Sequence, residues 1–295
     1  MKCSLCPRSC NVDRKFDTKM GFCQMPEDVY LARAALHKWE EPCISGEEGS
    51  GAVFFTGCQL RCVFCQNYNI AAGRKGKKVS VERLAEIFLE LQAKNANNIN
   101  LVTPTHYVPA IIKALEISKN QGLNIPIVYN TSAYENIDTL KSLEGLIDVY
   151  LPDLKYVSSQ ASAKYSNAPD YFEVATKAIS EMYRQTKTPI FNEKGIMVRG
   201  MIVRHLMLPG LLNDTKAVIK YLYDTYKDNI YISIMNQYTP LKQVANIKEL
   251  NRKITKREYN KVIDYAIELG IENAFIQEGA TAKESFIPEF DYEGV

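Results

Sequence analysis

Residues 52–67 read AVFFTGCQLRCVFCQN and place three cysteines directly after a short apolar run. Cys58, Cys62 and Cys65 form a C-x3-C-x2-C spacing. Three thiols leave one iron of a four-iron cluster open to another ligand. They are also one short of a closed zinc site, so a zinc knuckle with a distant fourth ligand is the competing interpretation. The stretch therefore predicts a metal-binding loop at the end of a buried strand.

The composition of the chain argues against several classes of protein. Its 295 residues include 36 basic and 34 acidic side chains, a net charge of +2 that does not favour a nucleic-acid partner. No apolar run approaches the ~18 residues of a membrane-spanning helix. The start, MKCSLCPRSC, lacks the apolar core of a secretion signal. We therefore expect a cytoplasmic protein with no membrane partner, whose eight cysteines are metal ligands or redox groups rather than disulfides.

From residue 52 onward, β-prone runs alternate with helical patterns, which is typical of parallel βαβ units. Six such units predict an α/β fold, a partial (β/α)6 TIM-like barrel, with a doubly wound sheet as the alternative. We expect residues 1–50 to form an irregular, cysteine-rich metal-binding segment and residues 51–295 to form the barrel. The expected strands are 52–56, 99–103, 125–130, 147–151, 201–208 and 231–236, with 272–277 as a seventh or edge strand. The expected helices are 81–95, 108–120, 135–144, 171–186, 215–227 and 255–268.

Polar side chains follow most of these strands. Both architectures build their sites at the carboxyl ends of parallel strands, so these residues are candidates for cofactor binding. The groups are Thr56 to Cys58, Thr103 to His106, Asn130 to Ser132, Asp153 to Lys155, and Asn236 to Tyr238.

The cysteine loop after the first strand of such a chain resembles that of the radical S-adenosylmethionine (SAM) superfamily. Within it, TGCQLRCVFCQN, IDVYLPDLK and VRHLMLPG are similar to segments of the enzymes that activate glycyl-radical enzymes, such as pyruvate formate-lyase activating enzyme. The N-terminal CSLCPRSC and HKWEEPCISG resemble a less characterised, activating-enzyme-like branch. The resemblance covers most of the chain after residue 50.

This resemblance implies a radical SAM oxidoreductase. Cys58, Cys62 and Cys65 would hold a [4Fe–4S] cluster whose fourth iron binds the amino and carboxylate groups of SAM. One electron, from a reductant such as flavodoxin or ferredoxin, would cleave SAM to methionine and a 5′-deoxyadenosyl radical that abstracts hydrogen from a substrate. Lys155, in the Asp153-x-Lys155 motif, and Arg204 would contact the SAM carboxylate and ribose, since both carry donors without acceptors. The alternative for each is a structural ion pair.

Three motifs depart from the family pattern. The Gly-Gly-Glu after the second strand is replaced within LVTPTHYVP, where Thr103, Thr105 or His106 stands as a substitute hydrogen-bonding group, with the backbone carbonyls of that strand as the alternative. The acidic segment after the third strand begins here with Asn130, which puts the family's nearby cation in doubt. The Tyr-His after the sixth strand reads Tyr238-Thr239, so we expect Gln237 or Tyr238 to contact adenine or ribose.

The remaining cysteines lie near the N-terminus. Cys3, Cys6, Cys10 and Cys23 are enough for one tetrahedral zinc or an auxiliary [4Fe–4S] cluster, with unligated thiols as the alternative. Cys43 is either a buried small residue or a thiol near the active site. His106 is either a catalytic acid or base or a helix-capping residue.

Three functions follow from this reading. The first is a radical SAM enzyme that activates a glycyl-radical enzyme, which would be a protein substrate. The second is a radical SAM enzyme acting on a small molecule or a peptide side chain, an epimerase or similar. The third is a non-catalytic iron–sulfur or zinc protein, which the cationic residues at the strand ends disfavour.

Overall fold

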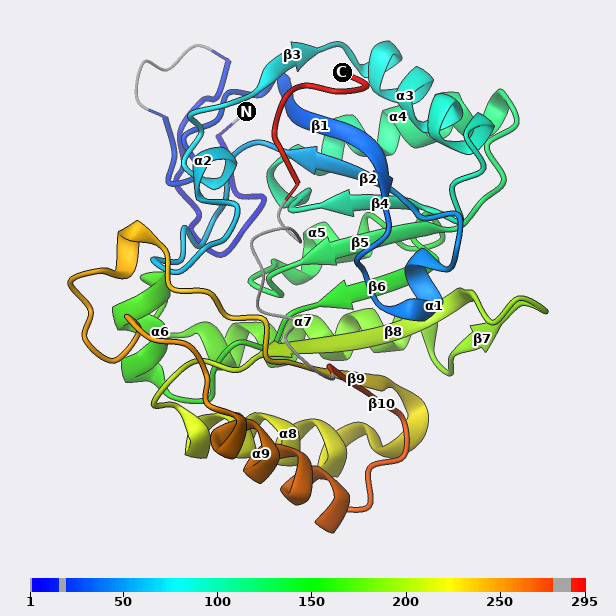
Figure 1. The fold of residues 1–295 in the computed structure, drawn as a ribbon. Coiled ribbons are helices and arrows are strands. Elements are labelled where there is room, and N and C mark those ends of the chain that lie inside the picture. The colour runs from blue at the N-terminus through cyan, green and yellow to red at the C-terminus, as the bar shows by residue number, and fades with distance from the viewer. Residues whose placement is uncertain (1, 16–19, 278–287) are drawn as a thin grey trace.

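The computed structural model describes residues 2–15, 20–277 and 288–295, and its strands join in one open sheet (Figure 1). The order along the sheet is β10-β9-β8-β6-β5-β4-β2-β1-β3, with β7 paired to β8. The ends of this order do not pair, so the barrel is partial, as predicted. The strands that pair in parallel are β2 (Ser50–Phe55), β4 (Ile99–Val102), β5 (Ile127–Thr131), β6 (Val149–Pro152), β8 (Met197–Leu206), β9 (Tyr231–Met235) and β10 (Ala274–Ile276). The others are β1 (Val29–His37), β3 (Lys77–Val79) and β7 (Ile190–Phe191).

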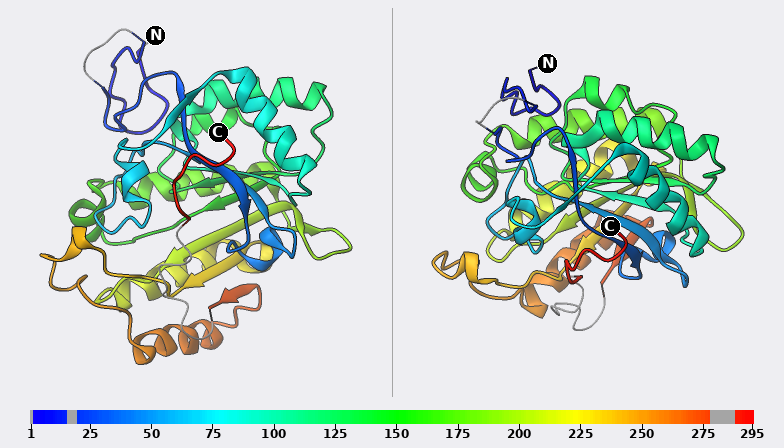
Figure 2. Two further views of the ribbon diagram at one scale, coloured as in Figure 1. Left: turned by 45° about the horizontal axis from the view of Figure 1, so that its top comes forward. Right: turned by 90° about the horizontal axis from the view of Figure 1, so that it is seen from above.

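The long helices cover one side of the sheet, and the C-terminal tail lies on the other (Figure 2). Helix α3 shows why they form: Ser80 caps its start by accepting from the Arg83 amide, and its apolar residues recur on one buried face. The helices are α1 (Pro42–Ser45), α2 (Tyr68–Ala71), α3 (Val81–Ala93), α4 (Val108–Asn120), α5 (Ile137–Lys141), α6 (Ser159–Ser166), α7 (Tyr171–Thr186), α8 (Leu212–Tyr226) and α9 (Lys256–Glu268).

Alternation along the strands divides the apolar residues between the two faces of the sheet. In β5, Tyr129 belongs to the large core that includes helix residues such as Ile111 and Ile179. Its neighbour Val128 belongs to a smaller core on the other face, together with Cys43 and Ile44 of α1. Helix α1 therefore fills part of the barrel interior.

The N-terminal segment differs from expectation because it contributes a strand. The irregular backbone expected for residues 1–50 is seen over much of residues 2–28, but β1 pairs antiparallel with β2, and His37 lies opposite Ser50. The sequence of β1, VYLARAALH, is rich in alanine, which has low β propensity, and the pairing register shifts between Leu31 and Arg33. Both features weaken the alternating pattern by which a strand is predicted.

The last described residues return to β1. The Ala34 amide donates to the Glu293 carbonyl at 2.8 Å, and the Phe290 ring meets Phe54 of β2 edge-on at 5.5 Å. Within the described part of the chain, no helix is both long and apolar enough to span a membrane.

The arrowheads of β2, β4, β5 and β6 point to the side of the sheet where the N-terminal segment lies (Figure 1). The polar residues that follow these strands therefore gather there.

Candidate functional site

The loop after β2 carries the three clustered cysteines, and its first turn requires glycine. Gly57 has a φ of 94°, and a Cβ on it would lie 2.2 Å from Cγ of Met25 and 3.0 Å from the Cys23 carbonyl oxygen. The N-terminal segment therefore packs directly against the start of this loop. Cys58, Cys62 and Cys65 all line one cavity of about 230 Å³.

A network of charges forms another part of the cavity wall. Arg204 of β8 donates from Nε to Asp153 at 2.9 Å, from one terminal nitrogen to Glu40 at 3.1 Å, and from the other to Asn130 at 2.6 Å. Asp153 also accepts from Lys155 Nζ at 2.7 Å. Burial would raise the pKa of Asp153, but Arg204 and Lys155 together hold it below its usual range. Two cations thus contact two carboxylates in this largely buried network, and the charge of Glu41 also acts on Arg204.

Glu40 is a residue that the sequence reasoning missed. It lies between β1 and α1, yet its carboxylate reaches into the barrel, accepting from Asn100 at 3.1 Å and from Arg204. Burial raises the pKa of Glu40, and Arg204 opposes that rise. His37, the last residue of β1, and Trp39 from the same connection as Glu40 also line the cavity. The polar residues of HKWEEP were the signal in the sequence for a site. Their place inside the barrel follows from strand β1, which the sequence did not predict.

The surroundings of the thiols disfavour their ionised form. Burial raises the pKa of Cys62 to about 11, while Lys155 acts in the opposite direction. Burial also raises the pKa of Cys65, and its two neighbouring loop cysteines add to the rise. The three thiols line the same cavity. Buried thiols of this kind ionise when a metal supplies the compensating positive charge.

Six of the eight predicted cofactor-binding residues line this cavity: Thr103, Asn130, Asp153, Lys155, Arg204 and Gln237. Thr103 adopts a φ of 58°, a conformation that β-branched residues rarely take and that is found at functional sites. The ion-pair alternative for Lys155 and Arg204 is present in the structure, since both contact Asp153.

The structure keeps the other two predicted cofactor contacts out of the cavity lining. Thr105 is buried, accepts from Gln59 Nε2 at 2.8 Å and donates to Glu135 at 2.6 Å. Tyr238 is buried, and its hydroxyl donates to the Leu250 carbonyl at 2.7 Å. A residue that follows directly after a strand therefore does not always reach the cavity with its side chain.

Both catalytic candidates also lie outside the cavity lining. His106 is buried with Nε2 at 2.7 Å from the Thr56 carbonyl oxygen, and burial lowers its pKa to about 3. Cys43 lies in α1 among apolar residues, and burial raises its pKa to about 12. The surroundings of Cys43 favour the buried small residue. His106 caps neither the turn after β4 nor α4, because neither has a side-chain cap and its Nε2 is bonded to Thr56.

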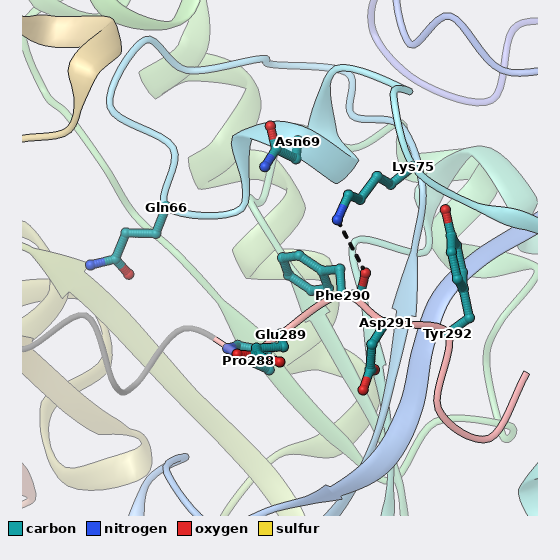
Figure 3. A pocket seen from close by; sticks show the side chains of 8 residues that line it. All are labelled: Gln66, Asn69, Lys75, Pro288, Glu289, Phe290, Asp291 and Tyr292. Atoms are coloured by element: carbon teal, nitrogen blue, oxygen red, sulfur yellow. Dashed lines mark hydrogen bonds between the residues drawn. The ribbon is translucent and has the colours of Figure 1, made fainter.

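A second cavity, of about 470 Å³, adjoins the first and shares Gln66 and Pro288 with it (Figure 3). It lies between the end of the cysteine loop and the C-terminal tail, where Lys75 Nζ is 3.5 Å from the Phe290 carbonyl oxygen. No cysteine contributes to its lining. The smaller cavity is therefore the one that all three loop cysteines line.

The family model of the Radical SAM superfamily matches residues 52–222, more than half of the chain. The chain belongs to the radical SAM superfamily. The match includes the cysteine loop, Lys155 and Arg204 and begins after Glu40. Membership in the radical SAM superfamily implies an enzyme with a [4Fe–4S] cluster and SAM. The finer prediction, a glycyl-radical activating enzyme, stays a prediction.

Individual proteins resemble this radical SAM chain at lower identity. The uncharacterized protein MJ0674 of Methanocaldococcus jannaschii is 28% identical over 273 residues, covering 90% of this chain and 74% of that protein. SuiB of Streptococcus suis, in its structure with S-adenosylmethionine, matches with a TM-score of 0.50 and 16% identity, covering 75% of this chain and 48% of SuiB. Methylornithine synthase (PylB) matches with a TM-score of 0.49 and 15% identity, over 71% of this chain and 59% of PylB. The chain thus spans about half the length of the solved structures, and the likeness to them is one of fold.

The three loop cysteines fit the cluster that the radical SAM family implies. They share one cavity, and Leu60, Cys62 and Phe64 of the loop are buried, which shields that wall from water. Among the described residues, no group of three or more histidines, cysteines, aspartates and glutamates is arranged to hold a single metal ion.

The N-terminal cysteines have different surroundings. Burial raises the pKa of Cys6 to about 12, with smaller contributions from Cys10 and Cys23. The Phe22 amide donates to Cys10 Sγ at 3.3 Å. These thiols contribute to neither cavity. The second metal site therefore stays a prediction.

Proposed function

We propose that this chain uses a [4Fe–4S] cluster held by Cys58, Cys62 and Cys65 to cleave SAM reductively. The observation that carries the proposal is that these three cysteines share one cavity with Asp153, Lys155 and Arg204, at the carboxyl ends of parallel strands. When bound, the cluster supplies the electron that converts SAM into methionine and a 5′-deoxyadenosyl radical, which abstracts hydrogen from a substrate.

Lys155 is the strongest candidate to meet the SAM carboxylate. Its ammonium carries three donors, and one of them is directed to Asp153 at 2.7 Å. Arg204 has three of its five N–H groups directed to Asp153, Glu40 and Asn130, so its main role is to hold those side chains in place. Thr103 and Gln237 add hydrogen-bonding groups on the same cavity wall.

The hydrogen donor that we favour is a glycyl-radical enzyme. The support is the resemblance of the cysteine loop and of the Asp153-x-Lys155 segment to the activating enzymes. A small molecule or peptide side chain is the second candidate, because Glu40 and the exposed Trp39 give this cavity a lining that the matched family region does not supply. A flavodoxin or ferredoxin would deliver the electron.

The N-terminal cysteines form our proposed second metal site, for zinc or an auxiliary cluster. The support is the C-x2-C-x3-C-x12-C spacing of Cys3, Cys6, Cys10 and Cys23, together with an irregular backbone that needs a cross-link to hold its shape. The described thiols are not arranged around a single ion in this structure, so metal binding would draw them together. In this proposal the site stabilises the N-terminal segment against Gly57 and the cysteine loop.

The test is anaerobic reconstitution with iron and sulfide, followed by incubation with SAM and dithionite. We expect a cluster signal in electron paramagnetic resonance (EPR) that changes when SAM is added, and formation of 5′-deoxyadenosine. A reconstituted chain that binds a cluster but neither responds to SAM nor forms 5′-deoxyadenosine would refute the proposal. Adding pyruvate formate-lyase as a probe then tests the favoured substrate class, through the EPR signal of a glycyl radical.

A further inference from the structure

A buried serine hydrogen-bonds one cysteine of the loop. Ser166, the last residue of α6, places its hydroxyl oxygen 2.9 Å from Cys62 Sγ, although 104 residues separate them in the chain. The Ser166 side chain has no exposed surface. Among the described residues, Cys62 is the loop cysteine for which a side-chain donor is found.

A second hydroxyl, that of Tyr156, extends this hydrogen bond into a chain of two. Tyr156 Oη lies 2.9 Å from Ser166 Oγ, and Tyr156 is also fully buried. A metal-bound cysteine is a thiolate and can only accept, so Ser166 must donate to Cys62. Ser166 Oγ then accepts from Tyr156. Two aligned hydrogen bonds in a water-excluded site strengthen each other.

The backbone around Ser166 holds the hydroxyl in place. Asn167, the residue that follows α6, adopts a left-handed conformation with φ of 53°. The Val63 amide of the cysteine loop donates to the Tyr165 carbonyl at 2.9 Å. Arg8 donates from Nε to the Gln59 carbonyl at 2.9 Å and from a terminal nitrogen to the Asn167 carbonyl at 2.6 Å. The loop and the end of α6 are thus fastened together on both sides of Ser166.

We propose that Ser166, aligned by Tyr156, is a positioning residue that raises the reduction potential of the cluster through its hydrogen bond to Cys62. The inference rests on the proposed function, which places the cluster on this cysteine. Reduction adds negative charge to the cluster and its sulfur ligands, so a donor to Sγ stabilises the reduced state more than the oxidised state. The N-terminal segment takes part through Arg8, which holds the end of α6.

The experiment compares four full-length reconstituted proteins: wild type, Ser166→Ala, Tyr156→Phe and Ser162→Ala. Ser162 is the matched control, because it is buried in the same helix and donates to the Ser159 carbonyl at 3.1 Å rather than to the loop. The midpoint potential of the cluster is measured by EPR-monitored redox titration without SAM. We expect Ser166→Ala to shift it to a more negative value, Tyr156→Phe to shift it less in the same direction, and Ser162→Ala to leave it at the wild-type value.

An unchanged or more positive potential in Ser166→Ala would overturn the inference while leaving the proposed function intact. If Ser166→Ala fails to bind a cluster, Tyr156→Phe decides the matter, since it keeps the serine and removes only the aligning donor. A wild-type chain that binds no cluster at these cysteines would overturn the proposed function and this inference with it.

Discussion

The two groups of cysteines meet at the loop after β2 but face different surroundings. Cys58, Cys62 and Cys65 open onto a cavity lined by paired charges. Cys6 and its neighbours lie outside both cavities, in a segment fastened by arginines to backbone carbonyls. Thiol burial is common to both groups, so burial does not distinguish them. The difference is that the loop cysteines share a cavity with charged side chains that can bind and orient a substrate, whereas the N-terminal cysteines line neither cavity.

This contrast is the reason that we propose chemistry for the loop cysteines and a supporting role for the N-terminal cysteines. The arginines of the two regions differ in the same way. Arg204 on the cavity side binds carboxylate side chains, whereas Arg8 and Arg14 in the N-terminal segment donate mostly to backbone carbonyls. Removing a cation from each region should therefore have unequal effects.

The largest effect is expected at Arg204. Arg204→Ala leaves Asp153 and Glu40 with one fewer compensating charge in a buried site, which should lower the free energy of unfolding by about 3–5 kcal/mol. Arg252→Ala is the control, because its pair with Glu258 is partly exposed and should cost about 0–1 kcal/mol. Urea unfolding of both variants checks the prediction, and equal losses would contradict the buried-network account.

The next effect concerns pH and Glu135. Burial raises the pKa of Glu135 to about 7, against the opposing hydrogen bonds from Thr105 and Thr131. The folded protein holds this proton more tightly than the unfolded chain does. The contribution of Glu135 to the free energy of unfolding is therefore complete below about pH 4.5 and is lost as the pH rises to about 7. The loss amounts to about 3 kcal/mol, at about 1.4 kcal/mol per pKa unit. Glu135→Gln should remove this slope in unfolding measured from pH 4.5 to 8, and a variant that keeps the wild-type slope would count against it.

A smaller effect is expected at Arg8, which joins the two regions. Arg8→Ala removes charged hydrogen bonds to the carbonyls of Gln59 and Asn167, and should lower the free energy of unfolding by about 1.5–3 kcal/mol. Hydrogen exchange at the Val63 amide should accelerate more than exchange in β9. Exchange that rises equally in both places would show that Arg8 does not link the regions locally.

Much of the fold was predictable because it is encoded in local patterns. Helices α4 and α7 match the predicted ranges 108–120 and 171–186, since their apolar residues recur at helical spacing. Strand β1 was missed because alanine and a register shift hide its alternation. Six cofactor candidates reached the cavity because parallel strands end at one edge. Thr105 and His106 did not, because the short turn after β4 directs them into the core. Glu40 could not be predicted, since its place depends on the unseen pairing of β1.

The most direct test of the central claim compares the two cysteine groups in one assay. One protein carries Cys58→Ala, Cys62→Ala and Cys65→Ala, and the other carries Cys3→Ser and Cys6→Ser. Both are reconstituted anaerobically, and 5′-deoxyadenosine formed from SAM is measured per folded chain. We expect no product from the loop variant, and a less stable N-terminal variant that still forms product. Product from the loop variant, at the wild-type amount, would show that Cys58, Cys62 and Cys65 do not hold the cluster that cleaves SAM.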